Sequence, residues 1–182
     1  MLFRSLGSLD AFNDEITKEG IPAFGMGLGI NTDTVVVGNM GSSQRFDYTC
    51  LGDGVNLASR LEGQSKPYGV RIVIGSKTAM QINDEYFTLE LDCIAVKGKK
   101  EGVNIYTVLE VDTEKQERYN HAKNVHDLML EHYRKQKWDS ALHTIETLKG
   151  EFDESMNHYY DMMIERIGEL RETNLQIGRA HV

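Results

Sequence analysis

The hydrophobic pattern of this 182-residue chain changes its period once, close to Val111. Before that residue, short runs of alternating or β-branched apolar residues, typical of strands, are interleaved with segments whose apolar residues recur every three or four positions, as in helices. After Val111 only the helical spacing is found. Interleaved strands and helices predict a body of the α/β or α+β class, and the helical remainder predicts an appendage behind it.

These patterns divide the chain into four parts. We expect a body at residues 1–111, a polar linker at 112–116 and a tail of amphipathic helices at 117–176. The last six residues, 177–182, follow no usable pattern and look like a translated DNA-sequencing adapter, so they are left out of the fold prediction. We therefore expect the natural C-terminus to be missing, and Met1 to be an internal methionine of a longer protein.

Composition and charge exclude several classes of protein. Apolar residues make up 40% of the chain and charged residues 26%, which suits a packed soluble core. The 20 basic and 28 acidic residues give a net charge of −8, the wrong sign for a general nucleic-acid binder. Cys50 and Cys93 have no zinc-site spacing and form no disulfide framework, which fits a reducing cytosol. No apolar run approaches the roughly 20 residues of a membrane span.

The body is expected to alternate between short strands and short helices. Phe24–Ile30 alternates bulky residues with three glycines, which predicts a closely packed strand and not a phosphate-binding loop. Val35–Val37 is predicted as a buried strand that forms a hairpin with it around the turn Asn31–Asp33. The other predicted elements are a helix at 4–19, a loop at Gly38–Ser43, a strand at Phe46–Leu51, a helix capped by Asp53 and ended by Lys66–Gly69, a strand at Val70–Ile74, a helix from Ser76, and strands at Phe87–Val96 and Val103–Val111.

The tail is predicted to consist of three helices packed antiparallel. Their apolar faces are Ala122, Val125, Leu128 and His132 in the first, Trp138, Ala141, Leu142, Ile145 and Leu148 in the second, and Phe152, Met156, Tyr159, Met163, Ile167 and Leu170 in the third. The placement of Trp138 and Ala141 is loosely like a tetratricopeptide unit, although one unit is too few for an array. The histidines of the tail show no metal-ligand spacing.

The stretch Arg45–Glu62 holds the most informative chemistry in the sequence. It predicts a strand, a tight glycine turn and a helix. Asn56 and Arg60 are four residues apart, so they share one face of that helix. An amide and a guanidinium that project together can hold a sugar ring and stabilise charge that develops on a phosphate. From spacing alone, however, a surface amide beside a surface arginine is the more frequent explanation.

Four motifs, in order, resemble the class III adenylate and guanylate cyclases: Asn31-Thr32, Val36–Ser42, Tyr48–Glu62 and Val96–Lys99. The similarity runs nearly end to end from Phe24 to Leu109. Several motifs at the right separations are much more specific than any one of them. The resemblance implies a partial ferredoxin-like catalytic domain, an α/β sandwich of the α+β class with a mainly antiparallel sheet. The tail also resembles the helical extension behind many bacterial cyclases.

The resemblance implies a role for each of four residues. Asn56 matches the asparagine that orients the ribose, and Arg60 the arginine that stabilises the pentavalent transition state at the α-phosphate. Lys97 matches a lysine that contacts the terminal phosphates. Thr49 matches the position that helps to select the base, where adenylate cyclases have aspartate or threonine and guanylate cyclases tend to have cysteine or serine. Thr49 therefore favours ATP and resembles the threonine-bearing bacterial subclass.

The family's metal site is not matched in this sequence. Its two metal-binding aspartates and its base-reading lysine belong upstream of Phe24, where nothing corresponds to them. We therefore expect no metal ligand in this chain, Mg²⁺ or Mn²⁺ held by upstream residues, and no cyclase activity from this fragment alone. Asp47 and Asp53 are expected to be turn or cap residues. Arg45 has two equally good explanations, a contact with a substrate phosphate or an ion pair with Asp47.

Three functions follow from these observations. The first is a fragment of an adenylate cyclase that converts ATP to 3′,5′-cyclic AMP and pyrophosphate, as a homodimer with the active site at the interface. The second keeps the chemistry but uses GTP. The third is a non-catalytic regulatory module whose helical tail binds a protein partner. The resemblance implies a cytoplasmic location, with any membrane contact made only through a missing N-terminal region.

Overall fold

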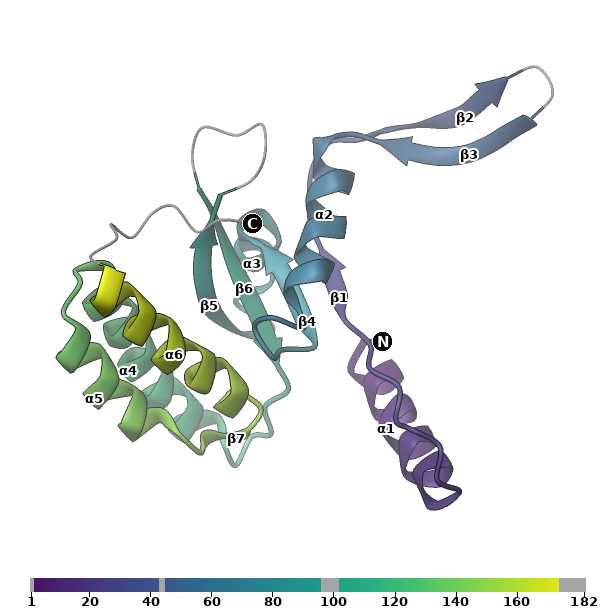
Figure 1. Cartoon of the computed structure of the whole chain (residues 1–182). Helices are drawn as coiled ribbons and strands as arrows, with labels where there is room; N and C mark the ends of the chain where they lie inside the picture. Colours follow the sequence, from purple (N-terminus) through teal and green to yellow (C-terminus); the bar gives the residue numbers. More distant parts are fainter. Residues whose placement is uncertain (1, 43–44, 96–101, 174–182) are drawn as a thin grey trace.

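The computed structural model of the chain describes residues 2–42, 45–95 and 102–173 (Figure 1). A four-stranded sheet lies in the middle, a long hairpin projects on one side of it, and the helices of the tail lie on the other. The elements in chain order are α1 (Leu2–Lys18), β1 (Leu28–Ile30), β2 (Val36–Ser42), β3 (Arg45–Leu51), α2 (Asp53–Gln64), β4 (Ile72–Gly75), α3 (Ser76–Ile82), β5 (Phe87–Ile94), β6 (Val103–Leu109), α4 (Gln116–Arg134), α5 (Trp138–Leu148), β7 (Glu151–Glu154) and α6 (Asn157–Thr173). None of the described helices is long and apolar enough to cross a membrane.

The central sheet is mixed, with the strand order β1-β4-β6-β5. Strands β1 and β4 pair in parallel, whereas β4 with β6 and β5 with β6 pair antiparallel. Helix α2 packs against β1 and β4, and α3 packs against β4 and β6. This layered arrangement with a mainly antiparallel sheet confirms the predicted α+β class.

The expected pairing of Phe24–Ile30 with the valine run is wrong. Only Leu28–Ile30 is a strand, and its partner is β4, while β2 pairs with β3 in an antiparallel hairpin. Strand β2 continues to Ser42, through residues that were expected to form a loop. Val36 and Val37 are 65% and 53% exposed, so the run is not buried. A run of β-branched residues favours a strand, but the run alone does not show whether other parts of the same chain will cover that strand.

The close packing predicted for the three glycines is confirmed at Gly27 and Gly29, against helix α2 and the residue after it, but not at Gly25, where nothing lies within 4 Å of an added Cβ. A Cβ atom on Gly29 would lie 2.2 Å from the carbonyl oxygen of Ala58 and 2.3 Å from the backbone nitrogen of Glu62. A Cβ atom on Gly27 would lie 1.9 Å from the Oγ of Ser65. Because Gly29 has no side chain, strand β1 can lie directly on the backbone of α2, and Gly27, just before the strand, leaves room for the side chain of Ser65 at the end of that helix.

The tail folds as α4, α5 and α6, with the short strand β7 before the last helix. The expectation that everything beyond the linker is helical is therefore wrong at Glu151–Glu154.

The apolar faces predicted for the second and third segments are confirmed, because their residues are buried or pack against the core. The face predicted for the first helix is partly wrong, since Leu128 is 44% exposed. The buried residues of α4 are Tyr119, Ala122, His126, Met129, Leu130 and Tyr133. Helix α4 packs against β5, α5 and β7, and its buried His126 also contacts Tyr160 of α6, so its buried side is set by several elements at once.

One hydrophobic core joins the body to the tail. Buried residues of the body, such as Leu61 and Leu89, belong to the same cluster as Met129, Tyr159 and Met163 of the tail. A second, smaller cluster joins α1 to the sheet, and its buried members are Leu6, Ile72, Ile74, Ala79 and Val108. The boundaries proposed from the sequence remain predictions, but the two parts share apolar side chains across them.

Candidate active site

Helix α2 carries both residues predicted to be catalytic. It follows Gly52, whose φ of 155° suits glycine and turns the chain out of β3. The expected cap, Asp53, is instead the first helical residue, where its charge meets the positive end of the helix. The buried residues of the helix are Gly54, Leu57 and Leu61. Asn56 is exposed and Arg60 partly exposed, on the opposite side. The amide and the guanidinium therefore share the outer face of α2, as their spacing predicts.

Asn31 ties the first turn of α2 to the sheet. Its Nδ2 donates a hydrogen bond of 3.1 Å to the carbonyl oxygen of Gly54. A Cβ atom on Gly75, at the end of β4, would lie 2.4 Å from the Oδ1 of Asn31, so the amide occupies space that only glycine leaves. The hydroxyl oxygens of Thr32 and Thr78 lie 2.9 Å apart. The Asn-Thr motif therefore fixes where α2 begins relative to β4 and α3.

A hollow of about 290 Å³ lies beside this turn. It is lined by Asn31, Asp33, Leu57, Ser76, Lys77, Gly102, Val103 and Asn104. The Nζ of Lys77 donates to the Oδ1 of Asp33 at 2.7 Å, so the two opposite charges offset each other. Neither Asn56 nor Arg60 lines this hollow. It lies against the inner face of α2, away from the predicted catalytic pair.

The residue predicted to select the base lies on the projecting hairpin. Thr49 is exposed and is paired in register with Gly38. Figure 1 shows the hairpin extending from the start of α2, away from the sheet. Arg45 is the first residue of β3, opposite Ser42, and its side chain lies outside the described part of the chain, as does the whole of Lys97. Thr49 therefore lies on the strand that leads into α2, and it does not line the hollow beside Asn31.

The described residues do not assemble a metal site. They contain no group of three or more histidine, cysteine, aspartate or glutamate side chains that could hold an ion. Asp47 and Asp53 are exposed, and Asp33 pairs with Lys77. These donors do not fit a divalent cation, which prefers several oxygen ligands around one point.

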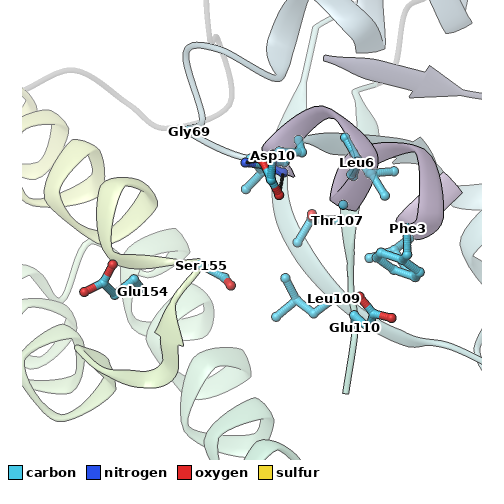
Figure 2. A pocket seen from close by; sticks show the side chains of 14 residues that line it. Phe3, Leu6, Asp10, Gly69, Thr107, Leu109, Glu110, Glu154 and Ser155 are labelled. Atoms are coloured by element: carbon cyan, nitrogen blue, oxygen red, sulfur yellow. Dashed lines mark hydrogen bonds and ion pairs between the residues drawn. The ribbon is translucent and has the colours of Figure 1, made fainter. Parts of the chain in front are cut away.

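A larger hollow, of about 510 Å³, lies where α1, the sheet and the tail meet (Figure 2). Figure 2 shows Leu6 and Asp10 on one side of it and Glu154 and Ser155 on the other. Arg71 donates two hydrogen bonds, of 2.7 and 2.6 Å, to the carboxylate of Asp10, and this pairing lowers the pKa of Asp10. The predicted site residues that the structure describes with their side chains, Thr49, Asn56 and Arg60, do not line this hollow. The sequence could not predict this hollow from a local motif, because two of its lining residues, Asp10 and Arg71, are 61 positions apart.

A polar network at the far end of α2 was missed by reasoning from the sequence. The hydroxyl of Tyr68 donates to the Oδ2 of Asp92 at 2.6 Å, and the Nη1 of Arg166 donates to the same oxygen at 2.5 Å. Burial, followed by the charge of Asp92, raises the pKa of Tyr68 far above its usual value. The one sign of this network in the sequence is Asp92, a charged residue inside a predicted strand. Its partners lie too far away in the sequence for spacing to reveal them.

Comparison with known proteins identifies the family. Residues 4–110 match the model of the family described as the adenylate and guanylate cyclase catalytic domain. An adenylate cyclase of Anabaena cylindrica is 43% identical over 108 residues, which are 56% of this chain and 22% of that protein. Adenylate cyclase 1 of Rhizobium meliloti (strain 1021) is 39% identical over 103 residues, which are 57% of this chain and 16% of that protein. The chain therefore spans less than a quarter of either relative.

A solved structure is similar as well. The adenylyl cyclase CyaB from P. aeruginosa superimposes with a TM-score of 0.52 and 33% sequence identity, over 59% of this chain and 54% of that chain. The family match includes the whole sheet and the outer face of α2 with Asn56 and Arg60. Because that match covers more than half of the chain, the chain belongs to the family of adenylate and guanylate cyclase catalytic domains.

Proposed function

We propose that this chain is part of an adenylate cyclase, which converts ATP to 3′,5′-cyclic AMP and pyrophosphate. The observation that carries the proposal is the pair formed by Asn56 and Arg60, four residues apart on the outer face of α2. The inner face of the same helix is held by buried Leu57 and Leu61. A rigid helix can therefore present the amide and the guanidinium to a nucleotide in a fixed relation.

The reaction requires positioning and charge stabilisation. The ribose 3′-oxygen forms a bond to the α-phosphorus while its proton passes to solvent, and the bond between the α-phosphorus and the oxygen that bridges to the β-phosphorus breaks, which releases pyrophosphate. The amide of Asn56 would orient the ribose, so that the 3′-oxygen faces the phosphorus. The guanidinium of Arg60 would donate hydrogen bonds to the α-phosphate oxygens as negative charge develops on them.

Three further residues are proposed to bind the nucleotide. Thr49 would contact the base and favour adenine over guanine. Lys97 would contact the terminal phosphates through its positive charge. Arg45 would contact a phosphate as well, or pair with Asp47 instead. These assignments are supported by the motifs that the chain shares with its family and by the place of Thr49 on the strand before α2.

The active site is proposed to form between two copies of the domain. The hairpin of β2 and β3 carries exposed apolar side chains at Val36, Val37, Tyr48 and Leu51. Such a surface is costly in water unless a partner covers it, and a second copy is the simplest partner. We expect the ligands of Mg²⁺ or Mn²⁺ on residues outside this chain, facing Asn56 and Arg60 across the interface.

The proposal is tested with a longer protein that includes the residues upstream of this catalytic segment. The purified protein is incubated with radiolabelled ATP or GTP and with Mg²⁺ or Mn²⁺, and the products are separated by chromatography. We expect 3′,5′-cyclic AMP and an equal amount of pyrophosphate, with ATP preferred in direct competition. A preference for GTP would replace the substrate assignment, and a folded dimer that forms no cyclic product from either nucleotide would refute the function.

A further inference from the structure

Side chains of the tail bond to four residues of β5, namely Thr88, through Lys123, and the three consecutive residues Glu90, Leu91 and Asp92. This strand lies at the edge of the sheet, and its register with β6 shifts between Glu90 and Asp92. A shift of this kind bends the strand and frees backbone groups from the ladder. Side chains of α4 and α6 bind Glu90, Leu91 and Asp92 at this point. The tail therefore covers a strand edge that would otherwise offer unpaired groups to another chain.

Helix α4 holds the first of the three consecutive residues. The Nε2 of His126 donates to the carbonyl oxygen of Glu90 at 2.7 Å, and its Nδ1 accepts a hydrogen bond of 2.9 Å from the hydroxyl of Tyr160. The carbonyl can only accept, so this tautomer follows from its partner. Burial lowers the pKa of His126 to about 4, so the ring is neutral at pH 7. Arg134 of the same helix pairs with the carboxylate of Glu90.

Helix α6 holds the other two residues. The hydroxyl of Tyr159 donates to the carbonyl oxygen of Leu91 at 2.7 Å. The Nη1 of Arg166 donates to the Oδ2 of Asp92 at 2.5 Å. The side chain of Asp92 is 11% exposed and that of Arg166 28%, so the ion pair is largely withdrawn from water. Removing the arginine would leave a carboxylate without its main partner in an apolar setting.

The same ion pair reaches the end of helix α2. The hydroxyl of Tyr68 donates to the carboxylate of Asp92 at 2.6 Å, and the guanidinium of Arg166 lies 5.3 Å from the centre of the Tyr68 ring. Tyr68 is 3% exposed, and its N–H bonds to the carbonyl oxygen of Gln64, the last residue of α2, at 3.1 Å. Arg60 lies one helical turn before Gln64. Arg166 is thus linked through Tyr68 to the part of the helix that carries Arg60.

We propose that Arg166 is a positioning residue for the nucleotide site, which makes the tail part of the catalytic unit. Arg166 donates to Asp92 and lies over the ring of Tyr68, which itself bonds to Asp92, so the three side chains brace the end of α2 against β5. The effect on turnover rests on the proposed function. The effect on α2 does not depend on which nucleotide binds.

Hydrogen exchange on the 182-residue chain tests the structural half of this proposal. In Arg166→Met, we expect amides at residues 61–70 and 90–94 to exchange at least roughly tenfold faster than in the wild type, with little change in α5. Arg171→Met is the matched control, because Arg171 also lies on α6 but pairs with Asp139 of α5, within the tail. Unchanged exchange at 61–70, or an equal rise along the whole chain, would overturn the proposal.

A second variant keeps this test decisive if Arg166→Met unfolds the chain. Tyr68→Phe removes only the hydroxyl that bonds to Asp92 and keeps the ring under the guanidinium. It is expected to speed exchange at residues 61–70 and to leave α4 and α5 unchanged. If the end of α2 exchanges at the wild-type rate in Tyr68→Phe, the proposed link between tail and helix does not exist.

Steady-state kinetics of the longer protein test the catalytic half. We expect Arg166→Met to lower kcat roughly tenfold while KM for ATP changes by less than about twofold, because Arg60 acts in the transition state. Arg166→Lys keeps a charged donor for Asp92 and should recover part of the loss, whereas Arg171→Met should behave as wild type. An unchanged kcat in Arg166→Met would contradict the proposal. If the wild type forms no cyclic nucleotide, the proposed function fails, and the exchange result alone decides whether Arg166 holds α2.

Discussion

Asn31 and Gly54 are joined by a single hydrogen bond of 3.1 Å, from a side-chain amide to a backbone carbonyl. Gly54 is the second residue of α2, so the bond sets the start of the helix just before Asn56. Asn31→Ala removes the donor and should lower the free energy of unfolding by about 1 kcal/mol. In the longer protein it should also lower kcat roughly tenfold, since the donors on α2 would no longer be held in place. Both effects are measured against Asn120→Ala, an exposed amide on α4, and equal kcat values in the two variants would contradict the positioning role of Asn31.

Gly29 should be the least replaceable of the three glycines in its segment. Its added Cβ would meet backbone atoms of Ala58 and Glu62 at 2.2 and 2.3 Å, and backbone cannot move aside without shifting α2. We expect Gly29→Ala to lower the free energy of unfolding by about 3 kcal/mol or more. Gly25→Ala is the control, because nothing lies within 4 Å of its added Cβ. Urea unfolding measures both, and a comparable loss in the two variants would argue against the packing of β1 on α2.

His126 should make the stability of the chain depend on pH. Burial, assisted by the charges of Lys123 and Arg134, lowers its pKa from 6.5 to about 4 in the folded state. Between these pH values the unfolded chain binds a proton that the folded chain does not. The free energy of unfolding should therefore fall as the pH drops from 7 to 4, by about 3 kcal/mol from this group. This part of the slope should be absent in His126→Gln. Urea unfolding of both proteins between pH 7 and pH 4 measures this difference. If the free energy of unfolding has the same pH dependence in the wild type and in His126→Gln, the prediction is wrong.

The hairpin should carry the dimer contact. Val36 and Met80 are similarly exposed, at 65% and 68%, but only Val36 lies on the hairpin. Val36→Asp should leave the fold intact and weaken the dimer of the longer protein at least roughly tenfold, because a charge would be buried at the interface. Met80→Asp should leave the dimer unchanged. Sedimentation velocity distinguishes the two, and a Val36→Asp protein that dimerises as the wild type does would place the interface elsewhere.

The strand–turn–helix unit around Gly52 could be predicted because its information is local. A glycine turn and a spacing of four residues suffice to put Asn56 and Arg60 on one helical face, and the structure agrees. The prediction that Val35–Val37 is buried is wrong for the opposite reason, because burial is not a local property. The composition of this run favours a strand, but exposure depends on what lies across from it, and Val36 and Val37 have no covering element in the described chain.

The network of Tyr68, Asp92 and Arg166 could not be predicted. Its members are 24 and 74 positions apart, and each alone is unremarkable in its own pattern. Three-dimensional packing alone reveals that the tail continues the core of the body. The role of Thr49 remains a prediction from family resemblance, because Thr49 is exposed on the hairpin and lines neither hollow. The role of Lys97, which lies outside the described residues, remains a prediction as well.

The central claim is that Arg60 stabilises negative charge in the transition state from the outer face of α2. The most direct test compares kcat and KM for cyclic AMP formation by the longer protein and by its Arg60→Ala and Arg171→Ala variants. We expect Arg60→Ala to lower kcat by roughly 100-fold or more and to change KM for ATP by less than about fivefold. Arg171→Ala should match the wild type. If Arg60→Ala retains the wild-type kcat, the active site does not lie on this face of α2.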